Sequence, residues 1–172
     1  MPPPLRRAAA LGVTCRTAGE ADLPLLAETY FSTRREEVAQ TGWPLDAQQR
    51  FLDHQFGAQH AHYQAHYPTA EWLVIERDGT ALGRLYVDEW ESELRLIDIA
   101  LLPEARGGGI GTALLEDLIE VAGDKGKPLS IHVERTNPAM SLYRRLGFAK
   151  ADEHGIYDLM IWTPPAGNDE VS

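Results

Sequence analysis

A run of glycines separates two segments with different hydrophobic periods. Residues 94–102 form a long apolar stretch interrupted by Asp98, typical of a β-strand, whereas the apolar residues between Ile110 and Ala122 recur at helical spacing. The intervening segment reads Arg-Gly-Gly-Gly-Ile-Gly-Thr over residues 106–112. Glycine leaves backbone N–H groups accessible, and the first turn of a helix carries unpaired N–H donors and a partial positive charge. The sequence therefore predicts a backbone anion site, suited to a pyrophosphate, between a strand and a helix.

Spacing distinguishes this segment from two common phosphate-binding loops. A P-loop needs Gly-Lys-Ser/Thr at this place, and no lysine follows these glycines. A dinucleotide-binding G-x-G-x-x-G needs glycine at position 112 or 114, where the chain has Thr112 and Leu114. What remains is R-x-x-G-x-G at the start of a helix, in which Arg106 could add a bidentate phosphate contact. Another kind of nucleotide binder and a flexible turn without a ligand stay open as alternatives.

Hydrophobic periodicity and turn residues predict the remaining elements. Helical spacing covers residues 20–38 and 45–67, and Asn137 with Pro138 opens a further helix that ends at Gly147. Strand-like segments lie at residues 13–16, 72–76, 81–87, 94–102, 129–133, 148–152 and 157–162. The predicted order is β-α-α-β-β-β-α-β-α-β-β, an α/β (α+β) domain with a mixed, largely antiparallel sheet flanked by helices. We expect one domain over residues 11–162, a disordered arm at residues 1–10 and a disordered tail at residues 163–172.

Charge and composition restrict the classes of partner. The net charge is −10 and the pI about 5.0, so the basic footprint of a nucleic-acid-binding protein is missing. An acidic surface attracts cationic partners such as amines, although it also serves solubility. Cys15 is the single cysteine, which fits a reducing compartment, and the sequence has no apolar stretch near the ~18 residues of a membrane span. We expect a cytoplasmic protein that binds neither nucleic acid nor membrane.

Two motifs in this order resemble those of the GNAT acetyltransferase family. One motif is the Q/R-x-x-G-x-G/A signature, here Arg106, Gly109 and Gly111, preceded by Pro-Glu-Ala at residues 103–105. The other motif begins at Asn137 and is similar to the family's N-x-x-A/S…L-Y…G-F segment. It continues with Leu-Tyr at residues 142–143 and Leu-Gly-Phe at residues 146–148. The resemblance covers residues 94–162, while the two preceding helices match only in number and position.

The resemblance implies a binding mode for acetyl-CoA as co-substrate. The fourth strand would be splayed from the fifth by a bulge near residues 99–101, and its free backbone groups would pair with the pantetheine arm. The backbone of the glycine turn would hold the pyrophosphate, Asn137 would contact the arm, and Tyr143 would lie near the thioester sulfur. The coenzyme-binding residues implied in this way are Leu101, Leu102, Arg106, Gly107, Gly108, Gly109, Ile110, Gly111, Thr112, Asn137 and Tyr143.

The same resemblance implies direct attack of a neutral amine on the thioester, without a covalent acyl-enzyme. Tyr143 would protonate the leaving thiolate, and a backbone N–H near Leu101 would stabilise the oxyanion. A buried, satisfied core residue is the alternative for Tyr143. For the general base we rank Asp98 first, with a buried carboxylate bonded to neighbouring backbone as the alternative for this residue. The other candidates are Glu134, His132, Glu89 or a water molecule.

The acceptor stays open, as a small-molecule amine or an amine of a protein. Tyr30, Phe31 and Trp43 are expected to line its pocket, from their position alone. We expect no metal site, because His62 and His66 have helical i, i+4 spacing but no third ligand. A homodimer is plausible by resemblance. The alternative function is a non-catalytic CoA-binding sensor or assembly module.

Overall fold

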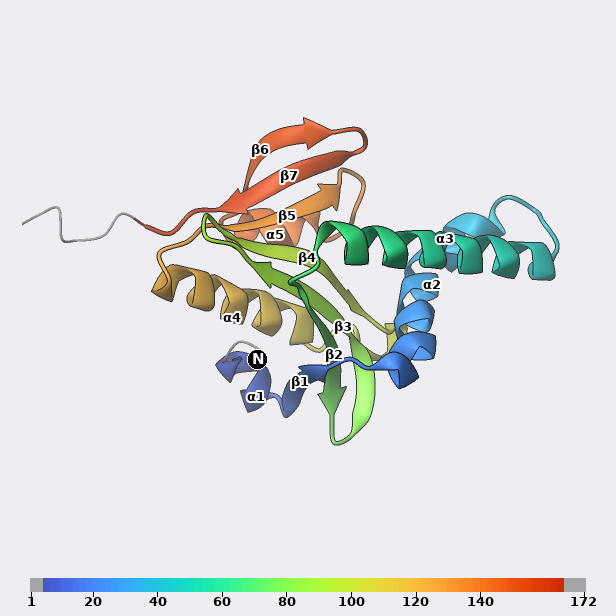
Figure 1. Cartoon of the computed structure of the whole chain (residues 1–172), viewed down its shortest axis with the longest axis horizontal. Coiled ribbons are helices and arrows are strands. Elements are labelled where there is room, and N and C mark those ends of the chain that lie inside the picture. Colours follow the sequence, from blue (N-terminus) through green and yellow to red (C-terminus); the bar gives the residue numbers. More distant parts are fainter. Residues whose placement is uncertain (1–4, 166–172) are drawn as a thin grey trace, which may run out of the picture.

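The computed structural model describes residues 5–165, and it consists of one sheet with helices on both faces (Figure 1). The helices are α1 (Arg6–Ala10), α2 (Leu23–Ala39), α3 (Leu45–His66), α4 (Ile110–Asp124) and α5 (Met140–Arg145), with short 3-10 turns at Glu20–Asp22 and Pro103–Ala105. The strands are β1 (Val13–Thr17), β2 (Glu71–Arg77), β3 (Thr80–Glu89), β4 (Leu94–Leu101), β5 (Leu129–Glu134), β6 (Ala149–His154) and β7 (Tyr157–Trp162).

The seven strands are ordered β1-β2-β3-β4-β5-β7-β6 in the sheet. Every neighbouring pair is antiparallel except β4 with β5, which is parallel. This confirms the predicted mixed, largely antiparallel sheet and the order of elements from β1 onward.

Alternation along β3 divides the core into two layers. Leu85 and Val87 belong to the large cluster that also holds the buried faces of α1, α4 and α5. Tyr86, between them in sequence, points to the other face and packs with residues of α2 and α3. Successive side chains of a strand point to opposite faces, so one strand supports both helical layers.

Strands β4 and β5 separate soon after they begin. Their pairing consists of Leu94 with Leu129 and Arg95 with Ser130. Beyond this point the C-terminal part of β4 pairs only with β3. The predicted splay between the fourth and fifth strands is therefore present.

A β-bulge lies in β4, but its position differs from the predicted one. The register places Leu96 opposite Val87 and Asp98 opposite Tyr86, so Ile97 is the extra residue, two residues before the predicted 99–101. Leu94 and Leu96 face the large core cluster, and strict alternation would send Asp98 there as well. The extra residue moves Asp98 to the opposite face and returns Ile99 to the core, which explains why the bulge falls at this point.

The N-terminal segment is ordered from residue 6, which corrects the prediction of a disordered arm over residues 1–10. Residues 6–10 form α1, which packs on α4 with Ala8 fully buried. The carboxylate of Asp117 accepts the backbone N–H groups of Arg7 and Ala8, each at 2.9 Å, and so satisfies donors at the start of α1. Residues 1–4 of the predicted arm, and residues 166–172 of the predicted tail, lie outside the described residues.

Helix α3 is the longest helix, with 22 residues, and Figure 1 shows that it extends beyond the sheet. Its only buried residue is Leu52, although Phe56 and Tyr63 contribute to the layer beneath it. Within residues 5–165 we find no helix with the length and apolar character needed to cross a membrane.

Asp117→Asn tests how α1 is attached. The substitution keeps the shape of the side chain but replaces one of the two acceptor oxygens, so a buried N–H loses its partner. We expect the free energy of unfolding to fall by about 1–3 kcal/mol in urea denaturation. Asp124→Asn, at an exposed position of the same helix, is the control and should change it by less than about 0.5 kcal/mol. Equal values for the two variants would show that the Asp117 contacts do not hold α1.

Candidate functional site

The glycine turn before α4 presents a set of unpaired backbone donors. Gly107 and Gly109 have φ values of 80° and 83°, a left-handed conformation that favours glycine, and Gly109 is the N-cap of α4. The first hydrogen bond of the helix runs from the Ala113 N–H to the Gly109 carbonyl. Within the described part of the chain, none of the N–H groups of residues 107–112 has a backbone or side-chain acceptor. The turn therefore offers N–H donors without acceptors at the positive end of the α4 dipole, and anion binding at this place stays a prediction.

The Arg106 side chain folds back toward the end of β4. Its Nε donates to the Leu101 carbonyl at 3.0 Å and its Nη2 to the Ser32 hydroxyl at 3.3 Å. The guanidinium therefore lies between the glycine turn and α2, beside the backbone that is predicted to face the pantetheine arm. A contact from Arg106 to phosphate stays a prediction.

The backbone of Leu102 is not free, which corrects one predicted contact. Its N–H donates to the Leu82 carbonyl at 2.8 Å, and its carbonyl accepts the Ala105 N–H at 2.9 Å. Because alternate residues of a strand direct their backbone groups to opposite sides, the groups that face away from β3 belong to Leu101 and Ile99. The unpaired backbone groups of β4 therefore belong to Leu101 and Ile99, and Leu102 is not among them.

Gly83 on β3 lets the two strands approach at this end. It pairs with Leu101, and a Cβ built on it would lie 2.2 Å from the Ala100 carbonyl oxygen and 2.9 Å from the Leu101 Cα. Any side chain at this position would push the end of β4 away from β3. Gly83 thus helps to position the open backbone groups of β4.

Asn137 and Tyr143 lie at either end of the turn and helix that follow β5. The Asn137 Oδ1 accepts the Ala139 N–H at 2.8 Å, which is a capping contact, although α5 begins at Met140 and not at Pro138 as predicted. Tyr143 is buried and packs edge-on against Phe148, with ring centroids 5.5 Å apart. Burial, with a smaller effect of the Asp98 charge, raises the pKa of Tyr143. Its hydroxyl therefore stays protonated at physiological pH and is available as a donor.

A cavity of about 910 Å³ lies on the other side of β4. Its walls come from α2, α3, β4, β5 and the β6–β7 hairpin, and its aromatic residues are Tyr30, Trp43, Phe51, Tyr63, Tyr67 and Tyr157. Two of the three predicted pocket residues, Tyr30 and Trp43, line it. Phe31 does not: it is buried beneath the cavity against Tyr30 and Phe56.

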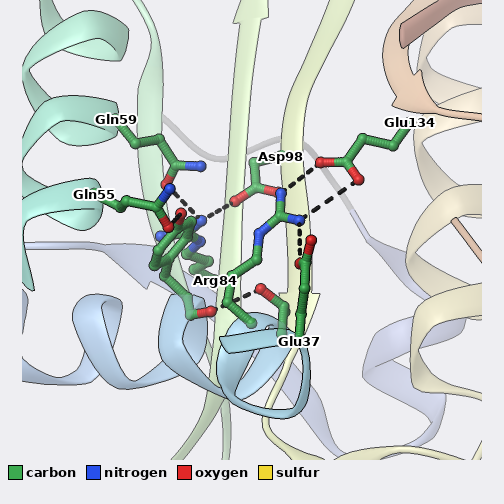
Figure 2. A network of polar contacts seen from close by, with 9 residues as sticks. Glu37, Gln55, Gln59, Arg84, Asp98 and Glu134 are labelled. Atoms are coloured by element: carbon green, nitrogen blue, oxygen red, sulfur yellow. Dashed lines mark hydrogen bonds and ion pairs between the residues drawn. The ribbon is translucent and has the colours of Figure 1, made fainter. Parts of the chain in front are cut away.

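Asp98, the first-ranked base, is paired with a buried arginine. Figure 2 shows Asp98 facing Arg84, and their Oδ2 and Nη2 atoms are 2.5 Å apart. Arg84 also donates from Nη1 to the Leu26 carbonyl at 3.3 Å and from Nη2 to the Gln59 Oε1 at 3.0 Å. The carboxylate is therefore the counter-ion of Arg84. Its charge also contributes to the raised pKa values of Tyr63, which lines the cavity, and Tyr143.

Glu134 and His132 both line the cavity from β5, as alternation predicts. Glu134 Oε1 accepts a hydrogen bond from Arg34 Nη2 at 2.5 Å. Burial and the neighbouring Arg95 guanidinium lower the pKa of His132, so its ring is neutral at physiological pH. Arg95 Nη1 lies 3.3 Å from the His132 Nδ1, and because arginine can only donate, this contact occupies the lone pair that would accept a proton.

Glu89 lies away from the cavity. It pairs with Leu94, at the opposite end of β4 from Leu101, and bonds Lys125 and Lys127. These two lysines hold the pKa of Glu89 below its usual range. Of the four side chains named as bases, Asp98 is the one that follows the β4 bulge, and it is not among the residues that line the cavity.

The two buried arginines, Arg84 and Arg95, were not identified from the sequence. Each interrupts an apolar strand and is almost fully buried. Arg95 donates from Nε to the Ser130 hydroxyl at 2.8 Å and lies over the Trp90 ring, 4.8 Å from its centroid. The sequence did contain a signal for these two residues. Each is a charged residue inside an otherwise apolar strand, with an opposite charge such as Asp98 nearby.

Metal and thiol chemistry have no evident site in the part of the chain described. Across residues 5–165, no group of three or more His, Cys, Asp or Glu side chains is arranged to hold a metal ion. Burial raises the pKa of the Cys15 thiol to about 12, so it is protonated and a poor nucleophile.

A family model described as the acetyltransferase (GNAT) family matches residues 33–148. A Bacillus subtilis (strain 168) protein, provisionally named as a ribosomal protein bS18-alanine N-acetyltransferase, is 36% identical over 84 residues, which are 46% of this chain and 54% of that protein. The streptothricin acetyltransferase of Streptomyces lavendulae is 34% identical over 82 residues, 45% of this chain and 43% of that protein. The chain thus spans about half the length, or less, of the curated relatives it matches.

Solved structures show the same fold. The PaiA N-acetyltransferase of Thermoplasma acidophilum, crystallised with coenzyme A, has a TM-score of 0.66 at 19% identity, over 88% of this chain and 98% of that one. The ribosomal-protein-S18-alanine N-acetyltransferase of Escherichia coli has a TM-score of 0.55 at 20% identity, over 91% and 97% of the two chains.

Gly83→Ala tests whether the close approach of β3 positions the open edge of β4. The added methyl group must displace backbone atoms, so we expect unfolding free energy to fall by about 1–3 kcal/mol in urea denaturation. Gly57→Ala in α3 is the control, because its Cβ would meet no atom within 4 Å, and it should stabilise by up to about 1 kcal/mol. A Gly83→Ala variant as stable as the parent would show that β4 does not depend on this contact.

Proposed function

Because the chain belongs to the GNAT acetyltransferase family, we propose that it transfers the acetyl group of acetyl-CoA to a primary amine. The family model covers residues 33–148, which include the glycine turn, the splayed strands and Tyr143. The observation that carries the proposal is the union of two features: unpaired N–H groups at the start of α4 and an open backbone edge on β4. One suits a pyrophosphate and the other an extended amide chain such as pantetheine.

The residues that would hold acetyl-CoA follow from this geometry. The backbone of residues 107–112 would bind the pyrophosphate, and Ile99 with Leu101 would hydrogen-bond the pantetheine arm as an added strand. Asn137 is proposed to contact the same arm. For Arg106 to reach a phosphate, its guanidinium has to leave the Leu101 carbonyl, which would free that carbonyl for the arm.

When bound, acetyl-CoA supplies an activated acyl group, and the chain's residues manage protons and charge around it. An alkylammonium has a pKa near ~10.4, so the amine must lose a proton before it can attack. Asp98 is proposed to take up this proton, directly or through water, because it follows the bulge and its charge acts on both Tyr63, which lines the cavity, and Tyr143. Its counter-ion is Arg84, and the proton would pass on to solvent.

Tyr143 and the β4 backbone are proposed to stabilise the charge that develops during attack. The N–H of Leu101 would donate to the carbonyl oxygen. The Tyr143 hydroxyl would donate to the departing sulfur. Thiols have a pKa near ~8.5, and burial raises the pKa of Tyr143 above its own usual range, so the hydroxyl would stabilise the thiolate by a hydrogen bond and keep its own proton.

Thiol release from acetyl-CoA, measured against a panel of primary amines, tests the function directly. We expect amine-dependent release of CoA by the full chain and a mass increase of one acetyl group on the amine. Gly109→Val, which forces a branched residue into a φ of 83°, should abolish both release and CoA binding. Binding of CoA without turnover of any amine would favour a sensor over an enzyme.

Tyr143→Phe tests the hydrogen-bond donor. Because Phe keeps the packing against Phe148, we expect KM for acetyl-CoA and the Tm to change little, whereas loss of the hydroxyl should lower kcat by roughly 10²-fold. Since burial raises the pKa of Tyr143, the hydroxyl stays protonated, and the rate of the parent enzyme should not fall between pH 7 and 9, where more of the amine is deprotonated. An unchanged kcat in Tyr143→Phe would remove Tyr143 from the mechanism.

A further inference from the structure

Two groups of exposed apolar side chains border the cavity from opposite sides. Trp43 and Phe51, at the junction of α2 and α3, are 44% and 37% exposed. Ile156 and Tyr157, at the β6–β7 turn, are 61% and 38% exposed. All four line the same cavity. Large apolar side chains left in water around a cavity indicate a surface that an apolar ligand covers.

Trp43 is held in place without a ligand. Its ring meets Phe51 edge-on, with centroids 5.4 Å apart. Its backbone N–H donates to the Thr41 hydroxyl at 3.2 Å, and its backbone carbonyl accepts from Gln48 Nε2 at 2.7 Å. The backbone that carries the indole is thus held before a ligand packs against the ring, which lowers the entropy lost on binding.

The two acidic residues that line the cavity share one arginine. Its acidic lining residues are Glu37 and Glu134, and both contact Arg34, at 3.4 and 2.5 Å. The second lining arginine, Arg95, is paired with Glu93 at 3.4 Å. Although the chain carries a net charge of −10, each acidic residue that lines the cavity already contacts a guanidinium, which disfavours the additional ammonium groups of a polyamine.

We propose that the acceptor is a primary amine attached to an aromatic or branched apolar body, which packs between Trp43 and Tyr157. This inference rests on the proposed function and names the substrate class of that site. The cavity of about 910 Å³ is near the upper end of ligand pockets, so a short alkylamine would leave most of it unfilled. The apolar body would occupy the mouth, and the amine would extend past Tyr63 toward Asp98.

A comparison of tryptamine, n-butylamine and spermidine as acceptors tests this assignment. We expect kcat/KM for tryptamine to exceed that of each of the other two by at least about tenfold. Trp43→Ala should reduce the ratio of kcat/KM between tryptamine and butylamine by about tenfold, mainly through KM. Leu45→Ala is the matched control, because Leu45 is 82% exposed, two residues away and outside the cavity lining.

Calorimetric titration of tryptamine into the protein saturated with CoA separates the two proposals. Binding that Trp43→Ala weakens and Leu45→Ala does not would support the apolar acceptor site, even if no amine were turned over and the proposed function failed. Preference for spermidine or butylamine, equal effects of the two variants, or absence of tryptamine binding would overturn the inference, whether or not acetyl transfer occurs.

Discussion

Strands β4 and β5 run parallel and pair at two positions only, Leu94 with Leu129 and Arg95 with Ser130. Arg95 stabilises the paired end of the two strands, because its Nε donates to the Ser130 hydroxyl and its guanidinium lies over Trp90. Beyond these two pairs the strands diverge, and β4 has no neighbouring strand on the side of β5. Unpaired backbone groups are costly unless something binds them, so the divergence prepares the edge for an extended ligand. The glycine turn follows at the end of this edge and supplies the complementary anion site.

The bulge at Ile97 connects this edge with the cavity. It sends Asp98 to the face of α2 and α3, where Arg84 compensates its charge. A buried ion pair contributes little net stability, but loss of either partner would leave a buried charge uncompensated. Arg84 and Asp98 thus specify which face of β4 meets the cavity, while Ile99 and Leu101 return to the core beside α4.

Features that depend on local sequence were predictable, and features that depend on distant contacts were not. Periodicity gave the order from β1 to β7, and the positive φ of Gly107 and Gly109 agrees with the predicted turn. Residues 6–10 carry too little periodicity to predict a helix, since α1 depends on Asp117, 109 residues from Ala8. Phe31 was wrongly assigned to the cavity, because an apolar residue of a helix can face either the core or a cavity. The Leu102 contact was misjudged because its partner, Leu82, lies on another strand.

We propose that the backbone of β4 and the glycine turn together bind one coenzyme A molecule. Residue-resolved amide hydrogen exchange, recorded by NMR with and without CoA, tests this binding mode. We expect CoA to slow exchange at the amides of residues 107–112 and of Ile99 and Leu101. The Leu102 amide, already bonded to Leu82, should change little. Protection confined to other parts of the chain, with the amides of residues 99–112 unchanged, would show that coenzyme A does not bind here.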